Sequence, residues 1–92
     1  MIIKKTASAG TATKNDALIT ISPRAEEGIE VELKSIVAVQ FGDQLIAAAR
    51  GMAQEMDVSS ALIQIEDKGA LDYVIRARTE AAILRTQGGT DE

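Results

Sequence analysis

The alternating segment IEVELK at residues 29–34 is the feature that most restricts the fold of this chain. Apolar and charged residues take turns along it, which is the pattern of a strand with one buried and one solvated face. Immediately afterwards the apolar spacing changes to three or four residues, which predicts a helix over about 36–56 with Ser35 as its N-cap. The expected inward face of that helix consists of Val37, Phe41, Leu45, Ala48, Met52 and Met56. A strand and a helix that are each apolar on one face are expected to pack together in two layers.

The remaining apolar segments predict three more strands and a second helix. Residues 16–22 are rich in β-branched side chains and end at Pro23, which cannot donate a hydrogen bond to a sheet. Residues 61–66 alternate again, and the more weakly patterned residues 2–11 are expected to form one further strand. The second helix is predicted over about 70–86, with the inward residues Leu71, Val74, Ala77, Ala81 and Leu84.

The predicted order of elements is strand, strand, strand, helix, strand, helix. This order describes an α+β fold, in which a small sheet of about four strands carries both helices on one face. A chain of 92 residues is long enough for one core and too short for two. We therefore expect a single domain over residues 1–86, followed by a flexible polar tail over residues 87–92.

The composition argues against several classes of function. The chain has no Cys and no His, so it lacks the commonest zinc ligands, a thiol nucleophile and the usual neutral-pH proton shuttle, and no metal site is expected. The formal net charge is −4 and the only aromatic residues are Phe41 and Tyr73, which argues against nucleic acid as a partner. No stretch approaches the roughly 20 apolar residues of a membrane span, so we expect a cytoplasmic protein without membrane contact. A non-catalytic binding or carrier module is favoured over an enzyme.

The polar segment at residues 12–16 separates the first two predicted strands. Asn15 and Asp16 both favour turns, so this segment is expected to form the exposed tip of a hairpin.

Four short motifs, taken in order, resemble those of one family. They are AGT at residues 9–11, followed five residues later by Asp16, then QFG at 40–42, DKGALD at 67–72 and IRAR at 75–78. In this order and at this chain length they are similar to the acyl carrier (gamma) subunit of citrate lyase, from Lys4 to about Arg85.

This resemblance implies a function that composition does not show. Members of the family carry 2'-(5''-phosphoribosyl)-3'-dephospho-CoA, joined through a phosphodiester to a serine in the N-terminal loop. A prosthetic-group transferase attaches this arm, and its terminal thiol holds an acetyl or citryl group. The thioester is presented to the alpha (acyl transferase) and beta (citryl lyase) subunits, and the carrier itself performs no chemistry.

The sequence departs from the family pattern at the attachment residue. Lys14 stands where the resemblance places the serine, and Asp16 stands where the family has aspartate. An amine would give an acid-labile phosphoramidate in place of a phosphodiester. Three explanations stay open: Thr13 takes the arm instead, this copy never carries the arm, or it is a related carrier with different chemistry. Lys14 would then be either a functional amine or a solvated turn residue.

Two further positions allow two interpretations each. Asp16 either orients the transferase or closes an Asx-type turn. Asp67, Lys68 and Asp72 either form a docking patch for partner subunits or start the second helix, with Asp67 as its cap and Asp72 near the positive end of its dipole.

Overall fold

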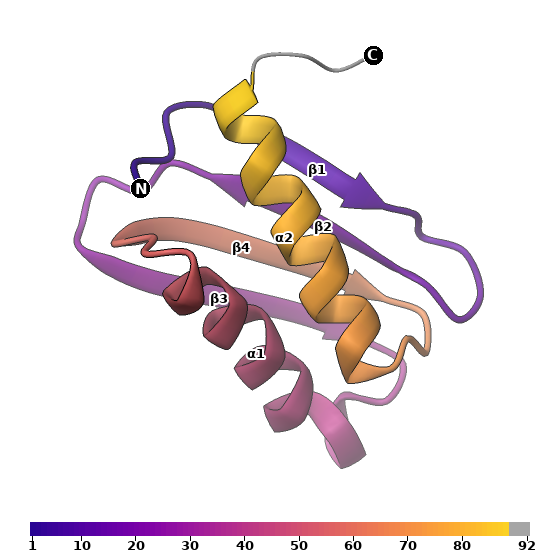
Figure 1. The fold of residues 1–92 in the computed structure, drawn as a ribbon. Coiled ribbons are helices and arrows are strands. Elements are labelled where there is room, and N and C mark those ends of the chain that lie inside the picture. The colour runs from indigo at the N-terminus through magenta and orange to yellow at the C-terminus, as the bar shows by residue number, and fades with distance from the viewer. Residues whose placement is uncertain (89–92) are drawn as a thin grey trace.

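The chain is described here by a computed structural model that covers residues 1–88. Its elements, in order, are β1 (Ala7–Gly10), β2 (Ala17–Ser22), β3 (Gly28–Ser35), α1 (Ala38–Glu55), β4 (Ser60–Asp67) and α2 (Asp72–Gly88). The predicted α+β class and the predicted order of elements are both confirmed (Figure 1).

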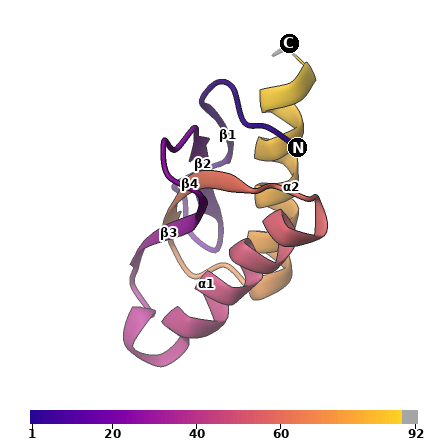
Figure 2. The ribbon, with the colours of Figure 1, turned by 90° about the vertical axis from the view of Figure 1, so that its left-hand side faces the viewer.

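The four strands form one mixed sheet in the order β1-β2-β4-β3. β2 lies antiparallel to β1 and to β4, whereas β3 and β4 are parallel. A parallel pair needs a crossover connection, and α1 supplies it. Both helices lie on the same face of the sheet, and no helix in the described residues covers the other face (Figure 2). β1 and β3 are the two edge strands.

The core lies between the central strands and the two helices. Alternate residues of β2 and β4 point into it, among them Ile19, Ile21 and Ile63, each with no exposed surface. The helices meet them largely through alanine and isoleucine, so the layers pack closely without any buried aromatic side chain. The inner face of the edge strand β3 is only half-buried, although its alternation of apolar and charged residues is present as predicted.

The inward face predicted for the second helix is wrong in part, since Val74 and Ala81 do pack against the core but Leu71, Ala77 and Leu84 are exposed. Leu71 and Leu84, expected inside, are 58% and 52% exposed. The buried residues of α2 are Ile75, Thr79, Ala82, Ile83 and Thr86. Two threonines can be buried there because each hydroxyl donates to a backbone carbonyl of its own helix, Thr79 to Ile75 at 2.8 Å and Thr86 to Ile83 at 2.6 Å.

The beginning of α1 also differs from the prediction. The N-cap is Val37, not Ser35, although the Ser35 hydroxyl does accept a hydrogen bond from the Val37 N–H at 3.0 Å. Phe41, expected on the inward face, is 46% exposed. The first turn of α1 projects past the end of the sheet (Figure 2), and the first buried residues of the helix are Gly42 and Leu45.

The other differences between the predicted and the observed elements lie at the two ends of the chain. The first strand begins at Ala7 because residues before it lie near the C-terminal end of α2, where the Ile2 carbonyl accepts a hydrogen bond from Gln87 at 2.9 Å. α2 extends to Gly88, so the first two residues of the expected tail are helical. The remaining tail residues, 89–92, lie outside the described residues.

Candidate attachment loop

The connection between β1 and β2 forms a hairpin loop with a β-turn at its tip. The Asp16 N–H donates to the Thr13 carbonyl at 3.1 Å, so Lys14 and Asn15 are the two central residues of the turn. Asn15 has a φ of 66°, and asparagine is one of the few residues that accept positive φ at this turn position. Residues 11–15 are exposed, as predicted for this segment.

Backbone hydrogen bonds fasten the loop to the segment after β4. The Asn15 N–H donates to the Lys68 carbonyl at 2.8 Å, and the Lys68 N–H donates to the Asp16 carbonyl at 3.0 Å. The hairpin loop and the DKGALD segment, which lie far apart in the sequence, are therefore neighbours in the fold.

The carboxylate of Asp16 is held by four hydrogen bonds. Its Oδ1 accepts from the Ala17 N–H at 2.7 Å and from Arg78 Nε at 3.2 Å. Its Oδ2 accepts from the Thr11 hydroxyl at 2.7 Å and from Arg78 Nη2 at 3.1 Å. These donors, first the Thr11 hydroxyl, then the Ala17 N–H and the Arg78 guanidinium, lower the pKa of Asp16 from 3.8 to about 2. Asp16 thus anchors the loop to α2 through a bidentate ion pair.

Gly10 makes this anchoring sterically feasible. It has a φ of 94°, and a Cβ added to it would lie 1.9 Å from the Ala17 carbonyl oxygen and 3.1 Å from Arg78 Cδ. Only glycine leaves room both for the close approach of the two strands and for the arginine stem that reaches Asp16.

The predicted site residues differ in their surroundings. The Thr13 hydroxyl lies 2.7 Å from the Thr11 hydroxyl, so Thr13 and Asp16 belong to one hydrogen-bonded group through Thr11. The Lys14 side chain makes no hydrogen bond or ion pair within residues 1–88. The sequence predictions missed the contribution of Arg78, because it is 62 residues from Asp16 along the chain.

The DKGALD segment is mainly a turn and helix start. Asp67 is 1% exposed, which removes it from any docking surface. Its Oδ1 accepts from the Ala70 N–H at 2.8 Å and its Oδ2 from the Ser35 hydroxyl at 2.7 Å, so it fixes the turn that precedes α2. Lys68 approaches Glu66 at 3.8 Å, and Asp72 lies exposed in the first turn of α2.

An apolar groove lies next to the hairpin loop. It has a volume of about 240 Å³ and is lined by Val37, Phe41, Gln44, Leu45, Gly69, Ala70, Leu71 and Asp72. Gly69 connects the groove to the loop, because a Cβ on it would lie 3.5 Å from Asn15 Oδ1 and 3.8 Å from Ile36 Cδ1.

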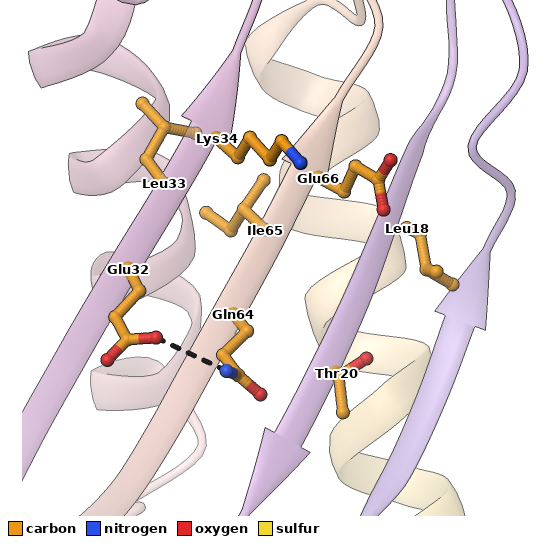
Figure 3. Close-up of a pocket in the computed structure, with 8 residues that line it drawn as sticks. All are labelled: Leu18, Thr20, Glu32, Leu33, Lys34, Gln64, Ile65 and Glu66. Carbon is orange, nitrogen blue, oxygen red and sulfur yellow. Dashed lines mark hydrogen bonds between the residues drawn. The ribbon is translucent and has the colours of Figure 1, made fainter.

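A second hollow, of about 360 Å³, lies on strands β2, β3 and β4, with the helices behind the sheet (Figure 3). Glu32 accepts a hydrogen bond from Gln64 at 3.2 Å there. The Glu66 carboxylate, which also lines the hollow, pairs with Lys68 at 3.8 Å. The two carboxylates have separate partners and do not form a pair suited to acid–base catalysis. Within residues 1–88, no group of three or more acidic side chains is placed to hold a metal ion.

Comparison with known proteins identifies the family. The model for the malonate decarboxylase delta subunit (MdcD) matches residues 4–86. The citrate lyase acyl carrier protein of Halothermothrix orenii is 45% identical over 92 residues, which cover all of this chain and 97% of that protein. The chain belongs to the citrate lyase acyl carrier protein family. The corresponding protein of Cronobacter sakazakii is 48% identical over 85 residues, which cover 92% of this chain and 87% of that protein.

The family's fold also occurs in a solved structure. A chain of the Pseudomonas malonate decarboxylase hetero-tetramer, crystallised with malonate, superposes with a TM-score of 0.63 over 91% of this chain and 86% of that one. At 20% identity this likeness supports the fold alone. The resemblance drawn from the four motifs is confirmed at the level of the family. Neither helix within residues 1–88 is both long enough and apolar enough to cross a membrane.

Proposed function

We propose that this chain is the acyl carrier subunit of a citrate lyase complex. In this role it presents an acetyl or citryl thioester, held on a covalent 2'-(5''-phosphoribosyl)-3'-dephospho-CoA arm, to an acyl transferase (alpha) and a citryl lyase (beta) subunit. The observation that carries the proposal is the exposed loop at residues 11–15, held at its base by the Asp16–Arg78 pair, in a chain 45% identical to a citrate lyase acyl carrier protein. The chain itself is non-catalytic in this proposal.

The phosphodiester bond of the arm restricts which residue of the loop can hold it. A phosphodiester requires a hydroxyl oxygen, which Lys14 does not have. Thr13 is exposed, lies one residue away in the same turn and has such an oxygen. When bound, the arm supplies a thiol that holds the acyl group as a thioester.

The architecture of the loop suits a carrier. An acyl group on a tether reaches an effective concentration in the millimolar range for a short flexible linker. The base of the tether is best held in one place so that its free end searches a limited volume. Asp16 and the backbone bonds to Lys68 provide such a fixed base, while the tip stays accessible.

We further propose that the apolar groove beside the loop contacts a larger subunit of the complex. Two large apolar side chains that line it, Phe41 and Leu71, are exposed, and so is Ile36, which lies near Gly69 at its edge. Contiguous exposed apolar surface is typical of interaction sites. Since the groove adjoins the loop through Gly69, a subunit whose active site receives an arm from the loop comes close to this surface.

One observation favours a second function, that of a structural subunit without the arm. Lys14 occupies the tip of the turn where the resemblance places the modified serine. A copy that has lost the attachment residue would retain the fold and its contacts with partner subunits.

Intact mass distinguishes the two functions. The wild-type chain and a Lys14→Ser variant are each co-expressed with the prosthetic-group transferase and the enzymes that form its donor. Added mass on the wild-type chain supports the carrier function. Added mass on Lys14→Ser alone refutes it and supports the structural subunit, and a bare mass for both chains also refutes the carrier function.

A further inference from the structure

We propose that Thr13 is the modified residue of this chain, and that Thr11 and Asp16 orient its hydroxyl for the reaction. The inference rests on the proposed carrier function and names the atom at which the arm is attached. It is built on the hydrogen-bonded row Thr13–Thr11–Asp16 in the hairpin loop.

The direction of each hydrogen bond in this row follows from the chemistry of its members. With a pKa of about 2, Asp16 is ionised at neutral pH and can only accept hydrogen bonds. The one hydroxyl proton of Thr11 is therefore donated to Asp16 Oδ2, 2.7 Å away. The 2.7 Å contact between Thr11 and Thr13 must then be donated by Thr13.

Donation of this hydrogen bond by Thr13 determines which side of its hydroxyl oxygen faces an incoming molecule. Its proton points back toward Thr11, so the lone pairs of its oxygen remain directed away from that bond. The Thr13 carbonyl also accepts the Asp16 N–H at 3.1 Å, so both its backbone and its side chain are tied to the same anchored residue. A nucleophile held in one orientation reacts faster than a freely rotating one.

The bond change is a phosphoryl transfer to oxygen. The donor is an activated phosphoribosyl compound in which the phosphorus is part of a phosphoanhydride. A new bond forms between Thr13 Oγ1 and this phosphorus, and the anhydride P–O bond breaks, with its electron pair leaving on the departing phosphate group. The hydroxyl proton is released to solvent. Asp16 is too weak a base to retain the proton, so it acts as a positioning residue.

Lys14 has a different part in this reaction. Lys14 directly follows Thr13 in the turn, and its ammonium group has no ion-pair partner within residues 1–88. A cation in this place attracts the phosphates of the donor. We therefore expect Lys14→Ala to slow modification without changing the residue that is modified.

The test locates the added mass by peptide fragmentation after co-expression with the transferase. In the wild-type chain we expect the phosphoribosyl-dephospho-CoA group on Thr13. Thr13→Val is expected to remain at its bare mass. The double variant Thr13→Val/Lys14→Ser is expected to be modified at position 14, which shows that the loop still folds and is still recognised.

The positioning role is tested by the initial rate of modification in vitro. Thr11→Val, which removes the hydroxyl between Thr13 and Asp16, is expected to lower that rate on the order of tenfold to 100-fold. Thr11→Ser keeps the hydroxyl and is expected to restore the rate. An unchanged rate in Thr11→Val would contradict the positioning role.

The outcomes separate this inference from the proposed function. A wild-type chain modified on a residue other than Thr13 overturns the inference and leaves the carrier function standing. A wild-type chain that bears no added mass overturns the carrier function, and this inference with it.

Discussion

Replacing Gly10 by alanine tests whether the close approach in the hairpin is as tight as the structure indicates. The chain offers a matched control at Gly28, because both glycines have positive φ, 94° and 103° respectively. The two positions differ in the space around an added Cβ. At Gly10 it would lie 1.9 Å from the Ala17 carbonyl oxygen, whereas at Gly28 the nearest atom, Arg24 Nη1, is 3.7 Å away.

The expected magnitudes follow from this difference. Positive φ costs an alanine roughly 1–2 kcal/mol, and this term applies at both sites. At Gly10 the strands must also move apart, and forcing an extra group into a packed region typically costs a further 1–3 kcal/mol or so. We therefore expect Gly10→Ala to lower the free energy of unfolding by about 2–5 kcal/mol and Gly28→Ala by about 1–2 kcal/mol. For a domain of this size the difference corresponds to a gap of roughly 4–24 °C in Tm.

Urea unfolding of both variants, followed by circular dichroism, measures the two losses. The Gly10 variant has a second readout, because its added Cβ would lie 3.1 Å from Arg78 Cδ and would displace the stem that reaches Asp16. The pKa of Asp16 is thus expected to rise in Gly10→Ala and to stay unchanged in Gly28→Ala. Equal losses of stability in the two variants, within roughly 0.5 kcal/mol, would refute the steric argument, since only the overlap separates them.

Four other predictions concern the loop and its surroundings. Thr11→Val removes the donor that lowers the pKa of Asp16 most, so a carboxyl NMR titration should show that pKa rising from about 2 toward 3.8. The pKa of Asp16 is lower in the folded chain than in the unfolded chain, so Asp16 adds stability above about pH 4, and this stability is lost as the pH falls toward 2. An Asp16→Asn variant whose stability fell with acid as much as that of the wild-type chain would contradict this role of Asp16. Asp67→Ala leaves two donors without partners and should lower the free energy of unfolding in urea by about 2–4 kcal/mol. Asp67→Asn keeps an acceptor and should lower it less. Equal losses in the two variants would rule out the hydrogen-bond explanation. Phe41→Asp should weaken binding to the larger subunits by on the order of tenfold or more in a calorimetric titration. Leu84→Asp, at a similarly exposed position on α2, should not, and equal weakening by both would refute the proposed contact.

The strands were the most predictable part of the fold. Alternation of apolar and polar residues with a period of two indicates which face of a strand is buried. The IEVELK segment lies in β3, as expected. The pairing of the strands was not predictable in the same way. Nothing in the local pattern shows that β4 inserts between β2 and β3, because the side chains of a strand do not identify its neighbours.

The orientation of α2 could not be read from its sequence because its apolar residues surround the helix. Tyr73 and Leu84 are exposed, as is Leu71 just before the helix, and threonines occupy part of the buried face. Burial of a threonine depends on whether its hydroxyl finds an acceptor within the helix, as Thr79 and Thr86 do. A pattern of apolar spacing does not contain that information.

The candidate site was predictable at its tip and not at its base. Turn-forming residues marked the hairpin, but the partner of Asp16 comes from α2, far along the chain. Arg76 and Arg78 lie two residues apart and so point to opposite sides of their helix, and the structure pairs Arg76 with Glu55 at 2.7 Å and Arg78 with Asp16. Which of the two arginines faces the loop is decided by the packing of the helix on the sheet.

The anchored base of the loop determines how the lysine at its tip should be interpreted. Gly10 is fixed by its pairing with Leu18 in the β1–β2 ladder, and Asp16 is fixed by four hydrogen bonds, so the residues between them cannot slip by one position. Lys14 therefore occupies the tip as a matter of geometry, and no shift in register brings a hydroxyl to that position. Relative to the serine that the resemblance implies at this position, lysine differs in its reactive atom, which is an amine nitrogen in place of a hydroxyl oxygen. A transferase that recognises the shape of this loop would still bind it, and the nearest exposed oxygen nucleophile it would meet is that of Thr13.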